Sequence, residues 1–221
     1  MKDIVRYHIK RIVKNKQIQE NAKRKRLGQY LEKEIIFIHI PKAAGVSINS
    51  SIYKNYGCSH APVGFYIENL GIEVYRSLFT FTFVRHPIDR FISAFEFLKK
   101  GGMHSIDRDF SDYFLLKSKD VNEFSRLFFE EKKIREYIHF KRQSDFLTWN
   151  GNIEVDFIGK FENLEEDFSV VCNAHGIQNN LQKLNVTQKK ESIDLEQENI
   201  DRLTQYYNSD FENFNYDHIS K

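Results

Sequence analysis

Three short runs of apolar and aromatic residues, each followed by a stretch with helical spacing, constrain the fold of this chain more than any other feature. The runs cover Glu34–Ile40, Leu78–Val84 and Val155–Gly159, and the helices expected after them cover Ser47–Tyr56, Pro87 up to the pair Gly101-Gly102, and Glu162–His175. A last helix is expected over Glu196–Tyr207. Because strands that alternate with helices pair in parallel and are covered on both faces, we predict an α/β fold with a parallel sheet flanked by helices.

One long segment interrupts this alternation. Residues 103–150 are rich in aromatic and charged side chains, and we expect them to form a helical insertion between two strands. The length of 221 residues suits one domain with an appendage. We therefore predict a domain over residues 34–221, preceded by a helical appendage over residues 1–33.

Several classes of protein are excluded by simple features. The longest uninterrupted apolar run, Ile35–Ile38, is far shorter than the roughly 18 residues of a membrane span. No apolar stretch follows the basic N-terminus, so we expect no secretory signal peptide. Two cysteines, Cys58 and Cys172, cannot form a disulfide framework or a zinc site. We expect no metal, and a reducing compartment, most simply the cytoplasm.

Charge is unevenly distributed. Residues 1–26 contain ten Lys/Arg and two Asp/Glu, a net charge of +8, so residues 27–221 must sum to −6 to give the total of +2. Apolar residues recur at helical spacing in this basic segment, at Ile4, Val5, Ile9, Ile12 and Val13. Such a helix either docks its apolar face on the body or contacts an anionic surface such as the inner face of a membrane. The acidic body argues against nucleic acid as a partner.

The first chemical motif is the turn between the first strand and its helix, Pro41-Lys42-Ala43-Ala44-Gly45-Val46-Ser47. A strand, a tight loop of small residues and a helix direct backbone N–H groups at an anion. Lys42 adds a full positive charge, and Gly45 allows close approach. The order Gly-Lys-Ser/Thr of a Walker A loop is absent, and no Asp ends the next strand, so an anionic donor that needs no metal fits best. An ordinary turn with an exposed lysine is the alternative.

The second motif begins where the second strand ends, in Phe83-Val84-Arg85-His86-Pro87-Ile88-Asp89-Arg90-Phe91-Ile92-Ser93-Ala94-Phe95. Ligands of parallel sheets bind at the carboxyl ends of strands, where Arg85 lies. Ser93 follows about one and a half turns into the helix and can face the same ligand. A guanidinium and a hydroxyl suit a phosphate monoester, although Arg and Asp near a helix start are also common without any ligand.

Together the two motifs resemble the nucleotide-binding elements of the 3′-phosphoadenylyl sulfate (PAPS)-dependent sulfotransferases. Later segments are similar to the branch of that family that sulfates carbohydrates. They are Gln143-Ser144-Asp145-Phe146-Leu147, residues 156–168 and residues 206–216. The resemblance extends over residues 34–216 in the expected order. It implies a P-loop NTPase-like fold, PAPS as donor and a carbohydrate hydroxyl as acceptor.

The resemblance also implies roles for individual positions. The 5′-phosphosulfate would be held by Lys42, Ala43, Ala44, Gly45, Val46 and Ser47, and the 3′-phosphate by Arg85 and Ser93. The sequence departs from the usual pattern at three positions: Ala43 replaces a Thr, His86 replaces an Asn, and Leu184 stands where a His often precedes the Asn-x-Ser/Thr segment.

Transfer of a sulfuryl group needs a cation at the departing oxygen and a base for the attacking hydroxyl. Lys42 is the predicted cation. We predict His60 as the base, because a catalytic His precedes the 3′-phosphate element by a similar distance in the carbohydrate branch. His104 is the second choice for the base, and a solvated loop histidine is the alternative for His60. We assign His104, Gln143 and Asp145 to the acceptor side.

Two other functions stay open at this point. One is an atypical P-loop kinase, and the other is a non-catalytic module that binds anions or glycans. The oligomeric state is left open.

Overall fold

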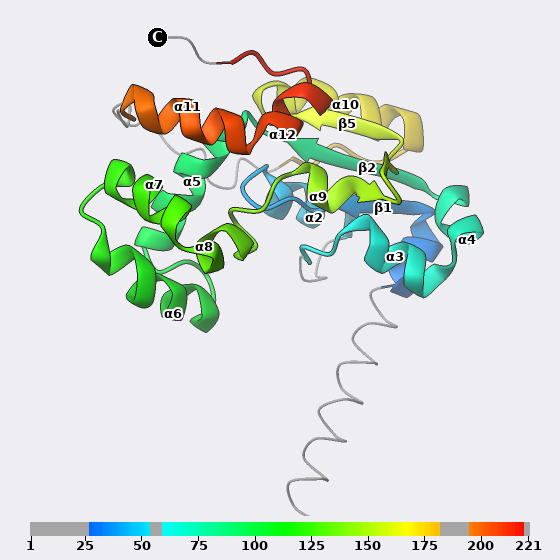
Figure 1. The fold of residues 1–221 in the computed structure, drawn as a ribbon. Helices are drawn as coiled ribbons and strands as arrows, with labels where there is room; N and C mark the ends of the chain where they lie inside the picture. The colour runs from blue at the N-terminus through cyan, green and yellow to red at the C-terminus, as the bar shows by residue number, and fades with distance from the viewer. Residues whose placement is uncertain (1–26, 54–58, 182–194, 219–221) are drawn as a thin grey trace, which may run out of the picture.

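The computed structural model describes residues 27–53, 59–181 and 195–218. Its central sheet has three parallel strands in the order β1 (Ile35–Ile38), β2 (Phe79–Val84) and β5 (Phe157–Lys160) (Figure 1). In the register, Phe37 lies opposite Phe81, and Phe81 lies opposite Phe157. The sheet is buried because apolar residues project from both faces of its strands. The prediction of an α/β fold with a parallel sheet is confirmed, with strands shorter than expected.

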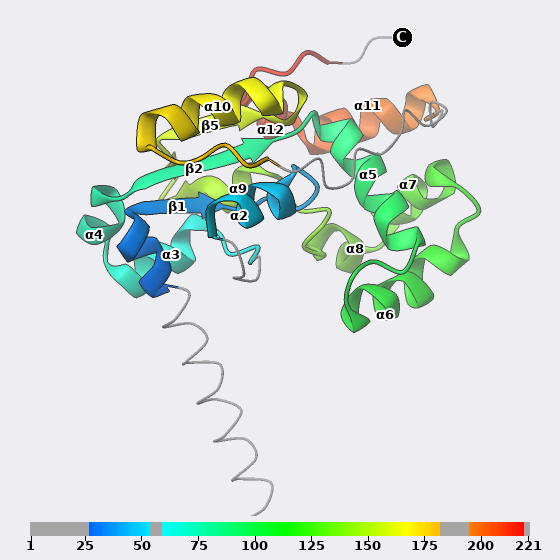
Figure 2. The ribbon, with the colours of Figure 1, turned by 180° about the vertical axis from the view of Figure 1, so that it is seen from behind.

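Helices cover both faces of this sheet. Helix α2 (Gly45–Tyr53) and helix α10 (Leu164–His175) lie on one face, and the short α9 (Ser144–Leu147) lies on the other (Figures 1 and 2). Helices α3 (Val63–Leu70) and α4 (Ile72–Ser77) connect the α2 region to β2. The expected helix over Glu162–His175 begins as a 3-10 turn, η2 (Phe161–Asn163), and ends as expected at Gly176, whose φ is 61°.

The insertion forms a second core. Helix α5 leads from β2 into it, followed by α6, η1, α7 and α8 (Figure 1). Their bounds are α5 Pro87–Lys99, α6 Ser105–Phe114, η1 Leu115–Lys117, α7 Val121–Glu130 and α8 Lys132–Glu136. Buried phenylalanines from these helices pack together, apart from the cluster around the sheet. The helical prediction for residues 103–150 needs one correction: β3 (Thr148–Trp149) pairs with β4 (Asn152–Ile153), because Asn150 and Gly151 both have positive φ and form a tight turn.

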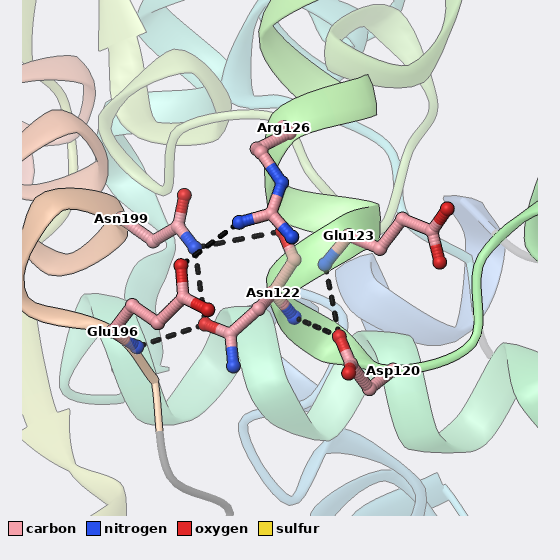
Figure 3. Close-up of polar contacts among 6 residues, drawn as sticks. All are labelled: Asp120, Asn122, Glu123, Arg126, Glu196 and Asn199. Carbon is pink, nitrogen blue, oxygen red and sulfur yellow. Dashed lines mark hydrogen bonds and ion pairs between the residues drawn. The ribbon is translucent and has the colours of Figure 1, made fainter.

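Helix α11 (Gln197–Tyr206) is attached to the insertion by a polar network (Figure 3). Asp120 caps α7 by accepting the N–H groups of Asn122 and Glu123 at 2.9 Å. The Asn122 side chain accepts the N–H of Glu196 at 2.8 Å, and Arg126 pairs with Glu196. The expected helix over Glu196–Tyr207 is thus present, and α12 (Asn208–Asn213) follows it.

Some predictions fall on residues that the structure does not describe. They include the basic segment 1–26, Cys58 and residue 184. Residues 27–33 are helical. The predicted boundary between an appendage and a domain at residues 33 and 34 stays a prediction. In the described part of the chain, no helix has the length and apolar character required to cross a membrane.

Candidate active site

The loop that joins β1 to α2 has an unusual backbone. Lys42 and Ala44 have φ angles of 70° and 60°, in the left-handed region that residues with a Cβ adopt at a cost of about 1–2 kcal/mol each. The loop also wraps closely around His39. A Cβ placed on Gly45 would lie 1.7 Å from Cδ2 of the His39 ring. Only glycine fits there, so Gly45 allows the close approach of an imidazole, whereas the sequence suggested only the approach of an anion.

Lys42 lies half-buried at the carboxyl end of β1. Its Nζ lies 4.0 Å from the centre of the Phe97 ring on α5. The pKa of Lys42 is lowered from 10.5 to about 8, mainly by burial and also by the positive charges of Arg85 and Lys100, while the charges of Asp107 and Glu96 oppose this shift. No described carboxylate forms an ion pair with Lys42. A partly buried cation without a counter-ion suits an anionic ligand.

Arg85 lies at the carboxyl end of β2, where the second motif predicted it. Its guanidinium lies 4.3 Å from the centre of the Phe161 ring. Burial lowers the pKa of Arg85, while Asp89 and Glu162 oppose that effect. Because β1 and β2 are adjacent parallel strands, Lys42 and Arg85 lie at the same edge of the sheet, and the charge of Arg85 contributes to the lowered pKa of Lys42.

Gln143 holds the backbone of Arg85 in place. The Arg85 N–H donates to Oε1 of Gln143 at 2.9 Å, and Nε2 of Gln143 donates to the Arg85 carbonyl at 2.8 Å. The Gln143 side chain is fully buried, and its own N–H donates to Asp210 at 2.8 Å. The sequence assigned Gln143 to the acceptor side. In the structure, the oxygen and the nitrogen of the Gln143 side-chain amide both form hydrogen bonds with the backbone of Arg85. We therefore assign Gln143 a positioning role.

Replacing Gln143 with leucine should therefore destabilise the protein. The change leaves the N–H and C=O of Arg85 without partners, which costs about 2–4 kcal/mol. In a domain of this size, the melting temperature should fall by roughly 5–15 °C. The matched control is Asp145→Ala, because Asp145 is exposed and should change the melting temperature little. Equal melting temperatures for Gln143→Leu and the wild type would contradict the positioning role.

His60 has a defined tautomer. Its Nδ1 lies 3.1 Å from the carbonyl oxygen of His39. A carbonyl oxygen only accepts hydrogen bonds, so Nδ1 bears the hydrogen and the lone pair of the neutral ring lies on Nε2. Burial lowers the pKa of His60 below its ordinary value of 6.5, against the effect of this hydrogen bond. His60 is therefore neutral at pH 7 and can accept a proton at Nε2.

Two further histidines surround His60, and the sequence reading missed them as site residues. The ring centre of His39 lies 4.3 Å from that of His60, and the ring centre of His139 lies 5.9 Å away. Burial lowers the pKa of both, to about 3 for His139. A histidine within a strand, such as His39, is typical of a structural residue, and His139 lies 79 residues from His60. No local pattern indicates this clustering, because it depends on how the insertion packs against β1.

The remaining predicted residues occupy varied positions. Ala43 and Ser47 are buried, Ala44 and Ser93 are half-buried, and Val46, His104 and Asp145 are exposed. Ser47 also lines a polar cavity of about 740 Å³. Its other lining residues are Ser50, Ser51, Glu165, Ser169, Asn179, Asn180 and Leu181. Lys42, Arg85 and His60 do not line this cavity.

One comparison with known proteins found a match. The model of a family described as "Sulfotransferase family" matches residues 31–217. No curated protein and no solved structure matches the chain.

Proposed function

Since this chain belongs to the sulfotransferase family, we propose that it transfers the sulfuryl group of PAPS to a hydroxyl group of a carbohydrate, in a polysaccharide, oligosaccharide or glycolipid. The carbohydrate class rests on the resemblance of residues 143–147, 156–168 and 206–216 to that branch. We propose a P-loop NTPase-like arrangement for the β1–α2 turn. Two cysteines in 221 residues fit a reducing compartment, so the cytoplasm is the proposed site of action. Residues 1–26 are the proposed contact with an anionic membrane surface.

The observation that carries this proposal is the convergence of Lys42, Arg85 and His60 at one edge of the sheet. Lys42 and the N-terminus of α2 suit the 5′-phosphosulfate, because a lysine and backbone N–H groups both bind anions. Arg85 and Ser93 suit the 3′-phosphate.

The proposed transfer is an in-line displacement at sulfur, to which the nucleotide supplies an activated sulfuryl group. His60 Nε2 accepts the proton of the acceptor hydroxyl as the new oxygen–sulfur bond forms. Lys42 stabilises the negative charge that grows on the departing phosphate oxygen, an interaction that is stronger in the transition state than in the ground state. At the end, the proton is on His60 and the nucleotide leaves as adenosine 3′,5′-bisphosphate.

Calorimetry with adenosine 3′,5′-bisphosphate and ATP tests the proposal. We expect the bisphosphate to bind more tightly than ATP, and to bind without Mg²⁺. Arg85→Ala should weaken its binding by about 1.5–3 kcal/mol, because a charged hydrogen bond is lost. The matched control is Arg76→Ala, since Arg76 precedes β2 at the opposite end of that strand. Tight binding of ATP that requires Mg²⁺ would favour a kinase, and no preference among phosphates would favour a non-catalytic module.

Binding of the bisphosphate should also weaken at alkaline pH. Lys42 has a pKa of about 8 in the free protein, and a bound dianion favours its protonated form. Binding above pH 8 therefore takes up a proton, so the Kd should rise by up to about tenfold per pH unit beyond pH 8 and change little between pH 7 and 7.5. Calorimetry at pH 7, 8 and 9 measures this slope. The Lys42→Met variant should have no such slope, and an equal slope in that variant would assign it to another group.

A further inference from the structure

Asp107 is a buried acid that the proposed transfer does not use. It lies in the first turn of α6 and is 4% exposed. Its Oδ2 accepts the N–H groups of Met103 at 2.9 Å and His104 at 3.0 Å. Its Oδ1 accepts the hydroxyl of Tyr137 at 2.6 Å. Burial alone would raise the pKa of Asp107, but these hydrogen bonds hold the pKa below its ordinary value, so the carboxyl group is ionised at pH 7.

This carboxylate is linked to His60 through His139. Nε2 of His139 lies 3.5 Å from Oδ1 of Asp107. The rings of His139 and His60 meet edge to face, with their centres 5.9 Å apart. Arg90 donates to the backbone carbonyl of His139 at 3.1 Å and so fixes this residue from the α5 side. Asp107, His139 and His60 therefore form a continuous row that ends at the proposed base.

The negative charge of Asp107 offsets part of the positive charge around His60. Burial lowers the pKa of His60. The other groups that shift this pKa are the His39 carbonyl, Asp107, His104 and Lys42. Among them, Asp107 is the only carboxylate, and its charge raises the pKa of His60. The same charge raises the pKa of Lys42. The site would gain another positive charge when His60 accepts a proton.

The backbone between α5 and α6 leaves room for the side chain of Asp107. Gly101 and Gly102 have φ angles of 87° and 63°. A Cβ placed on Gly102 would lie 2.2 Å from the Cβ of Asp107. The two glycines therefore end α5, as the sequence predicted, and also let the loop close over Asp107.

We propose, on the basis of the transfer proposed above, that Asp107 is a positioning residue: its carboxylate compensates the positive charge that forms on His60 and holds His139 against the His60 ring. The proton of the acceptor hydroxyl stays on His60 in this scheme, and Asp107 stays ionised throughout. In this scheme Asp107 contacts neither donor nor acceptor.

The test compares Asp107→Asn with the wild type in the full-length protein. Its first readout is the titration of His60, followed by NMR of histidine-labelled protein and assigned with His60→Gln. We expect the pKa of His60 to fall further below its ordinary value, because a negative charge is removed. The second readout is kcat with PAPS, which should fall about 10- to 100-fold with a smaller change in KM. Asp109→Asn removes an exposed acid of the same helix and should change neither.

Two further variants separate the effect of the Asp107 charge from effects on the local structure. Tyr137→Phe removes one hydrogen bond and keeps the carboxylate, so kcat should fall less than in Asp107→Asn. If Asp107→Asn does not fold, Asp107→Ser removes the same charge in a smaller side chain and should shift the His60 titration in the same direction. An unchanged His60 titration in a folded variant without the carboxylate overturns the proposal. Absence of turnover with PAPS in the wild type would instead overturn the proposed function, and the NMR readout would still decide the role of Asp107.

Discussion

Replacing Lys42 with methionine should lower kcat by about 10²–10³-fold, the range observed when one donor to a developing oxyanion is removed. The lysine is suited to this role because it is partly buried, lies over Phe97 and has no described carboxylate as partner. In such surroundings a positive charge acts more strongly than in water. The departing oxygen becomes more negative along the reaction, so the loss should appear mainly in kcat.

Methionine is the substitution at position 42 that best isolates the effect of the lysine charge. It keeps an unbranched side chain that can still cover the Phe97 ring, and it meets the same left-handed backbone at position 42 that lysine does. A loss of activity in Lys42→Met therefore reports the charge. The measurement is steady-state kinetics with PAPS and a sugar acceptor, with melting temperature as a check on folding.

Lys100→Met is the matched control for charge alone. Lys100 is exposed and acts electrostatically on Lys42. Its removal should leave kcat within a few-fold of the wild type, because a surface charge is screened by solvent. If Lys42→Met retained near-normal kcat, the departing oxygen would have to be stabilised by another group, and the backbone N–H groups at the start of α2 would be the remaining candidates.

The parts of this site that the sequence predicted are those specified by consecutive residues. The run Ile35–Ile38 followed by Pro41–Ser47 indicates a strand, a tight loop and a helix without reference to the rest of the chain. Arg85 follows from the same reasoning, because it directly succeeds an aromatic and β-branched run. A strand end fixes where such a residue lies in a parallel sheet, so its position could be predicted.

The parts that the sequence missed, or to which it gave a different role, depend on packing between distant segments. Gln143 bonds to the backbone of Arg85 across 58 residues, and a glutamine that follows basic residues is equally typical of a surface. Asp107 is one of several acids in α6, and only the positive φ angles of Gly101 and Gly102 bring the loop over it. Burial of such polar residues is decided by tertiary contacts, which a single sequence does not display.

Replacing His60 with glutamine should lower kcat/KM by about 10²–10⁴-fold, the usual contribution of a general base. Glutamine keeps a polar side chain of similar length and can still donate to the His39 carbonyl, but it cannot take up a proton near neutral pH. The fold should therefore survive while the base is lost. His175→Gln is the control, since His175 lies exposed at the end of α10, stacked on Phe79.

The pH profile provides the decisive measurement for His60. Only the neutral ring accepts a proton, so kcat/KM in the wild type should fall as pH decreases through the pKa of His60. Burial lowers this pKa, and the acidic limb should therefore lie below pH 6.5, the ordinary midpoint of a histidine. His60→Gln should have low activity and no limb in that range. A variant that keeps both the rate and the limb would remove His60 from the mechanism and leave His104 as the next histidine to replace.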